Sequence, residues 1–117
     1  MAASSKPKLT KEERFARIFS ELRQILVDEG ADLVVTDDDD QCYTLTNADG
    51  EYMTAVQVKK NYVSFHLMPV YCDPSLLDDV TPALLKRMQG KSCFNFTQPD
   101  PELFGELRAL VARSLAV

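Results

Sequence analysis

The most prominent group of side chains that could do chemistry is the aspartate run Asp37–Asp40. Clustered carboxylates can bind hard cations or iron through their oxygens. The run lacks the alternating ligands, central glycine and final glutamate of an EF-hand loop. Charge runs are more often solvated turns, and the charge also discourages pairing at a sheet edge. The sequence therefore favours a turn here. A metal site is the alternative, with the candidate ligands Asp37, Asp38, Asp39 and Asp40.

Histidine and cysteine are the other candidates for metal or nucleophile chemistry. His66 is the single histidine, and the cysteines are Cys42, Cys72 and Cys93. Their spacing contains no Cys-x-x-Cys or paired-histidine signature of a zinc site, and their odd number does not predict a disulfide framework. A Cys–His nucleophile pair is conceivable, but no nucleophile elbow or phosphate-binding glycine loop accompanies it. We predict reduced thiols, no enzymatic activity and no cofactor.

Two amphipathic helices must flank any site that the chain carries. Thr10 and Glu13 form a capping box, and an apolar stripe at helical spacing follows it. Gly30 stands where a left-handed C-cap belongs. A second cap signal, Asp100-Pro101, predicts a last helix with its own apolar stripe.

Strands are predicted between these helices by short apolar segments bounded by turn residues. The predicted strands are 31–36, 41–46, 51–59, 62–68 and 91–96. A short helix is predicted over 82–89, because Thr81-Pro82 is a cap signal and Gly90 ends the segment. Strands and helices do not alternate as βαβ units. The fold class expected is α+β: a two-layer sandwich with an antiparallel sheet, the order α-β-β-β-β-α-β-α, and the helices packed on one face.

Strand register predicts which side chains face these helices. A two-residue loop at Lys60-Asn61 pairs Val58 with Val63, and a four-residue loop at 47–50 pairs Leu45 with Tyr52. Both hairpins then place apolar residues on the same side of the sheet. The predicted core face comprises Tyr43, Leu45, Tyr52, Val56, Val58, Val63, Phe65 and Leu67.

The opposite face of the sheet is semi-polar, with sulfur and aromatic groups but little charge. The candidate binding residues on it are Gln57, Tyr62, Ser64, His66, Cys93 and Asn95, and Cys42, Thr44 and Met53 share their parity. Such a face is richer in sulfur and aromatic groups than contact with water requires. We therefore predict an interaction surface, with a plain solvent-exposed face as the alternative.

Composition narrows the possible partners and location. The net charge of −5 argues against binding nucleic acid or an anionic membrane. No segment has the apolar length of a signal peptide or a membrane span, so we expect a soluble, cytoplasmic protein. Residues 1–8 are expected to form a disordered tail, and 9–117 a single domain.

Residues 57–114 resemble the YdhG-like family of small uncharacterised domains. The resemblance rests on the segments 60–67 (KNYVSFHL) and 90–96 (GKSCFNF), and on the Pro-Glu-Leu at 101–103. It implies a two-layer α/β sandwich. Some relatives are regarded as frataxin-like iron chaperones, which implies iron handling as one function.

The function expected is that of a non-enzymatic binding or interaction module that acts through the open sheet face. The chain is expected to be a homodimer, with a small molecule or a protein as possible ligand. One alternative is a frataxin-like, iron-binding metal chaperone that uses Asp37–Asp40 and acidic residues of the first helix. A second alternative is an acidic export-type chaperone.

Overall fold

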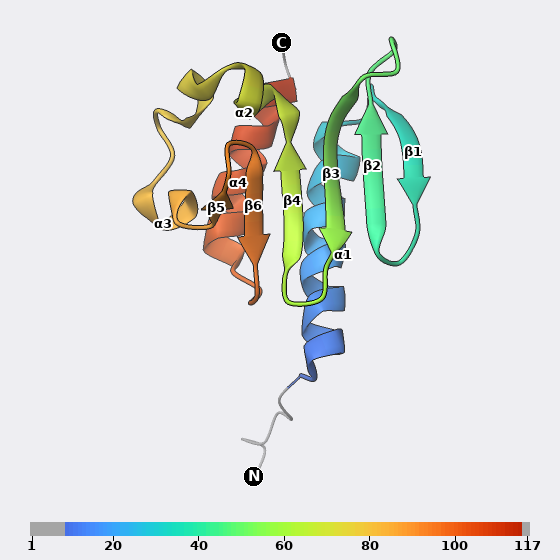
Figure 1. The fold of residues 1–117 in the computed structure, drawn as a ribbon, viewed down its shortest axis with the longest axis vertical. Helices are drawn as coiled ribbons and strands as arrows, with labels where there is room; N and C mark the ends of the chain where they lie inside the picture. The colour runs from blue at the N-terminus through green and yellow to red at the C-terminus, as the bar shows by residue number, and fades with distance from the viewer. Residues whose placement is uncertain (1–8, 116–117) are drawn as a thin grey trace.

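The structure is a computed structural model that describes residues 9–115. The predicted tail, residues 1–8, lies outside the described residues. The elements are α1 (Lys11–Glu29), β1 (Val34–Asp38), β2 (Cys42–Thr46), β3 (Tyr52–Val58), β4 (Val63–Leu67), α2 (Met68–Cys72), the 3-10 helix η1 (Pro74–Leu77), α3 (Pro82–Leu85), β5 (Met88–Gln89), β6 (Cys93–Phe96) and α4 (Pro101–Leu115) (Figure 1).

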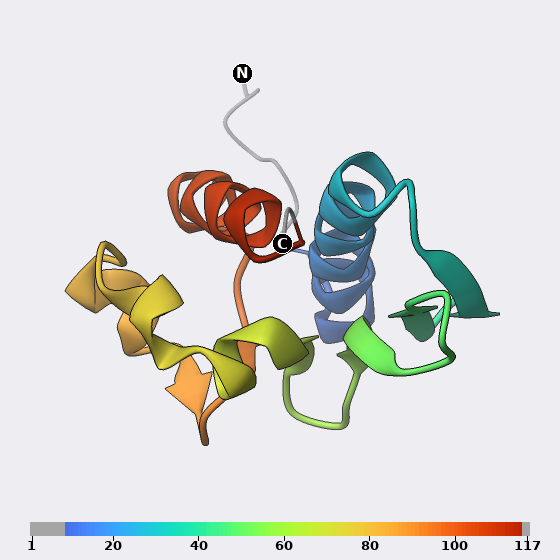
Figure 2. The same cartoon turned by 90° about the horizontal axis from the view of Figure 1, so that it is seen from above.

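The strands form one antiparallel sheet of six strands in the order β1-β2-β3-β4-β6-β5. Helices α1 and α4 contact each other and lie on one face of this sheet, which leaves the other face open (Figure 2). The predicted α+β fold class is confirmed. None of the described helices is long and apolar enough to cross a membrane.

Helix α1 has the capping box and the buried apolar stripe that its sequence predicts. The Thr10 hydroxyl accepts a hydrogen bond from the Glu13 backbone N–H (3.1 Å), and the Glu13 carboxylate accepts one from the Thr10 N–H (2.9 Å). This capping box satisfies N–H groups that have no partner within the helix. The apolar stripe is buried against the sheet through Phe15, Ile18, Phe19, Leu22, Ile25 and Leu26.

The predicted left-handed cap at Gly30 is wrong, because Gly30 has a φ of −106°. The glycine is needed for close approach instead. A Cβ at this position would lie 2.5 Å from Leu45 Cδ1 and 2.8 Å from the Leu26 carbonyl oxygen. The absence of a side chain lets the end of α1 rest directly on β2.

The predicted helix over 82–89 is also wrong in its second half. Helix α3 ends at Leu85, and Met88 and Gln89 form strand β5, which pairs with β6. Gly90 has a φ of +80° and turns the chain between these strands. Pairing with a distant strand has overridden the local helical pattern of this segment.

The register between β3 and β4 is as predicted, with Val58 opposite Val63. The register between β2 and β3 is not, because Leu45 pairs with Thr54 and Thr46 with Tyr52. Met53 is the extra residue of this β-bulge. A bulge reverses the facing of the residues beyond it, so Tyr52 lies on the open face instead of the predicted core face.

Strand β1 is displaced from the predicted segment 31–36 and begins at Val34. Residues 30–33 turn instead, with a hydrogen bond from the Leu33 N–H to the Gly30 carbonyl (3.0 Å). The strand then extends through Asp37 and Asp38, so half of the aspartate run is paired with β2 rather than in a turn.

Candidate functional site

The open face of the sheet brings the predicted binding residues together in cross-strand rows. In one row Gln57 pairs with Ser64, and Ser64 with Asn95; Cys42 of β2 is the next neighbour of Gln57. In the adjacent row Ala55 pairs with His66, and His66 with Cys93. The sixth predicted residue, Tyr62, precedes β4 at the hairpin end, opposite Lys59.

One side-chain contact on this face joins a base and a thiol, His66 and Cys93. His66 Nδ1 lies 3.0 Å from Cys93 Sγ. The Ser92 hydroxyl lies 3.3 Å from His66 Nδ1 and 3.4 Å from Nε2, so it can bond to one ring nitrogen at a time. When Nε2–H donates to Ser92, Nδ1 is free to accept the thiol hydrogen. Both strands that carry the pair are central in the sheet, which fixes its geometry.

Tyr52 completes this cluster, and the sequence interpretation had assigned it to the core. Its ring stacks on His66 with centroids 5.0 Å apart and an interplanar angle of 16°. Burial raises the pKa of Tyr52 to about 12, with smaller contributions from the nearby Cys93 and Cys42. The phenol is therefore neutral at physiological pH. Tyr52 and Met53 are adjacent and both apolar, so the sequence pattern does not predict which of them is the extra residue of the β-bulge.

Further hydrogen bonds connect the rest of the open face. Gln57 Nε2 donates to Cys42 Sγ (3.5 Å), and the Cys42 sulfur lies 3.4 Å from the Thr44 hydroxyl. Asn95 Nδ2 donates to Gln89 Oε1 (2.6 Å), whereas the buried Asn95 Oδ1 has no partner among the described residues. These side chains hold one another in place without any ion pair.

The centre of the open face is electrically neutral. Its side chains are Cys42, Thr44, Tyr52, Ala55, Gln57, Ser64, His66, Cys93 and Asn95. Ionisable charge is found at the rim, on Asp37 of β1 and on Lys59. Burial lowers the pKa of His66 below its ordinary value, which keeps the ring neutral at pH 7.

This lowered pKa predicts a pH dependence of stability. The unfolded chain protonates His66 near its ordinary pKa of about 6.5, and the folded chain does so only at lower pH. The unfolded state then binds more protons, so the free energy of unfolding falls as pH drops below about 6.5. Urea unfolding measured at about pH 7.5 and pH 5.5 should show this loss.

The loss should be smaller in His66→Gln; an equal loss in both proteins would contradict the prediction. The ring faces Tyr52, Ser92 and Cys93.

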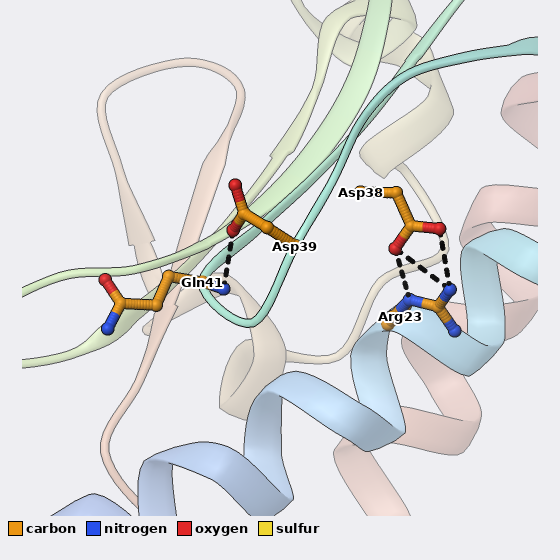
Figure 3. A network of polar contacts seen from close by, with 4 residues as sticks. All are labelled: Arg23, Asp38, Asp39 and Gln41. Atoms are coloured by element: carbon orange, nitrogen blue, oxygen red, sulfur yellow. Dashed lines mark hydrogen bonds and ion pairs between the residues drawn. The ribbon is translucent and has the colours of Figure 1, made fainter.

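The aspartate run is arranged differently from a metal site. Asp38 forms a bidentate ion pair with Arg23 of α1, with Nη2 to oxygen distances of 3.0 and 3.1 Å (Figure 3). The Asp39 carboxylate accepts the Gln41 backbone N–H at 2.8 Å and stabilises the turn between β1 and β2. Asp37 pairs with Thr44 and Asp38 with Tyr43, so the two carboxylates point to opposite faces of the strand.

Asp38 and Asp39 therefore stabilise this edge of the sheet. Arg23 also lies over the Tyr43 ring, 4.6 Å from its centroid, so it links α1 to both β1 and β2. Among the described residues 9–115, no three histidine, cysteine, aspartate or glutamate side chains gather closely enough to hold a metal ion.

Two hollows of the described surface are lined by residues outside the His66–Cys93 cluster. One lies between α1 and the β3–β4 hairpin and includes Phe15 and Lys60. Another is apolar and lies beneath α2, with Met53, Met68 and Ser114 in its walls. Met53 was expected on the open face, and the bulge has moved it to this side. Neither His66 nor Cys93 lines either of these hollows.

Comparison with protein-family models, with curated proteins and with solved structures finds no match to this chain. The resemblance to the YdhG-like family stays a prediction from the sequence.

Proposed function

We propose that this protein is a non-enzymatic interaction module whose open sheet face binds a second copy of the same chain. The observation that carries the proposal is the neutral centre of this face in a chain with a net charge of −5. Interface centres are depleted of charged residues and enriched in aromatic ones. An exposed sheet face that served only solvation would be expected to carry charged side chains.

Charge favours a second copy at this face. Two acidic chains repel each other over most of their surfaces. A face without ionised side chains at its centre lets two copies approach with the least repulsion. Added salt should strengthen the association, because it screens the repulsion between the remaining charges.

Shape favours a macromolecular partner over a small ligand. Small-molecule sites are concave and bury most of the ligand surface. The two hollows described above are lined by residues of the helices and of the hairpin end, whereas His66 lies between β3 and β6 in the middle of the sheet. Such a face can contact a large area of another protein, but it cannot enclose a small molecule.

Gln57→Glu tests the proposal. Gln57 is half-buried in the middle of the open face, so the substitution places two like charges in the interface of a dimer. Such juxtaposition costs several kcal/mol, which weakens self-association by about 100-fold or more. The measurement is the solution mass by sedimentation at two protein concentrations.

Gln98→Glu is the matched control, because it makes the same chemical change at an exposed loop position. We expect wild type and Gln98→Glu to be dimeric at high concentration and Gln57→Glu to be monomeric. A wild-type chain that stays monomeric at both concentrations and at high salt would exclude self-association as the function of this face.

A further inference from the structure

We infer that Cys93 is a site of reversible thiol modification, at which His66 activates the sulfur to form mixed disulfides with small, uncharged disulfides. The inference does not depend on self-association. It rests on the arrangement of Cys93, His66, Ser92 and Tyr52, which includes a nucleophile, a base and two groups that position the base.

The first support is the contact between sulfur and base. A thiol attacks a disulfide as its thiolate, so a base within hydrogen-bond reach increases the reactive fraction. His66 Nδ1 lies 3.0 Å from Cys93 Sγ. The two residues are direct cross-strand partners in neighbouring strands, so backbone pairing holds them together.

The second support is the positioning of the imidazole. Tyr52 stacks on the ring, and Ser92 can accept the Nε2–H hydrogen. In the tautomer that makes this hydrogen bond, Nδ1 carries a lone pair toward the sulfur. The pattern is that of a nucleophile whose base is oriented by a third group.

The third support is the contrast with the other cysteines. All of them are free thiols. Cys72 is exposed in α2 but has no histidine beside it, and Cys42 contacts the neutral groups of Gln57 and Thr44. Cys93 is only half-buried, so a small reagent can reach it. Comparing Cys72 with Cys93 therefore separates the effect of exposure on thiol reactivity from the effect of a neighbouring histidine.

The reaction proceeds as follows for a disulfide R–S–S–R. His66 Nδ1 takes the proton of the Cys93 thiol, and the sulfur attacks one sulfur of the reagent. The Cys93 S–S bond forms as the R–S–S–R bond breaks, and the electron pair leaves on R–S⁻. His66 returns its proton to that sulfur to give R–SH. Cys93 is oxidised to a mixed disulfide while half of the reagent is reduced, and any added thiol reverses the reaction. The neutral surroundings of Cys93 favour a reagent without charge.

The test treats the protein with substoichiometric hydroxyethyl disulfide at pH 7, quenches it with acid, and measures modification of each cysteine by peptide mass mapping. We expect Cys93 to react about tenfold faster than Cys72 despite its lower exposure. In His66→Gln the Cys93 rate should fall to or below the Cys72 rate, while the Cys72 rate stays unchanged. Circular dichroism of the variant reports whether it remains folded.

The comparison of Cys93 with Cys72 in the wild-type protein needs no variant. It is made at a low and a high protein concentration, because self-association through the open face would protect Cys93 only at the high one. A Cys93 rate no greater than that of Cys72 at both concentrations would overturn the inference. So would an unchanged Cys93 rate in a folded His66→Gln protein.

Discussion

We expect the Phe65→Ala variant to lose about 3–5 kcal/mol of unfolding free energy. Phe65 is 0% exposed and lies in the central strand β4, between Val56 of β3 and Phe94 of β6. Truncation removes a buried aromatic ring and leaves a cavity that fixed neighbours on both sides cannot fill. Urea denaturation followed by circular dichroism measures the loss.

Tyr52→Ala is the informative comparison, because the sequence pattern assigned Tyr52 to the same core face as Phe65. Tyr52 is 38% exposed on the open face and stacks on His66. Its truncation should cost only about 1 kcal/mol. Equal losses in the two variants would mean that Tyr52 faces the helices and that the bulge at Met53 is absent.

The Gly30→Ala variant should be destabilised by about 1–3 kcal/mol, although alanine can adopt the φ of −106° found at this position. The new methyl group would overlap the Leu26 carbonyl and the buried side chain of Leu45. Relief requires the last turn of α1 to distort and the Leu45 side chain to shift, which loosens contacts in the core. Thermal unfolding or urea denaturation measures the effect.

Gly105→Ala is the matched control for this prediction. Gly105 lies in α4, and a Cβ there would meet no atom within 4 Å. The same substitution should therefore stabilise the protein by about 0.5–1 kcal/mol through helix propensity. Opposite signs for the two variants would establish that close approach, and not backbone conformation, requires glycine at position 30. A Gly30→Ala protein as stable as wild type would contradict the contact with β2.

Local patterns predicted the parts of the fold that depend on neighbours in sequence. The capping box and apolar stripe of α1 and the tight loop at Lys60-Asn61 are of this kind, and both are confirmed. The errors arose where distant pairing decided the outcome. Met88 leaves the predicted helix because it pairs with Phe94, and no sequence pattern distinguishes the bulge at Met53 from regular alternation.

The candidate site was predictable only in part for the same reason. Alternation placed His66 and Cys93 on one face, since parity within a strand is a local property. Their contact depends on β6 lying beside β4, and residues 68–92 between these strands left the strand order open. Tyr52 and Ser92 join the cluster through a bulge and a turn, which have no periodic signal.

The strand order has a consequence for the path of folding. Strands β1 to β4 are neighbours both in space and along the chain, so their pairing closes only short loops. Pairing of β6 with β4 must instead close the excursion through α2, η1, α3 and β5, at a greater cost in chain entropy. The half of the open face that carries Cys93 and Asn95 is therefore expected to form more slowly than the other half. A nascent chain that has not yet closed this excursion holds the histidine of the cluster without its thiol partner.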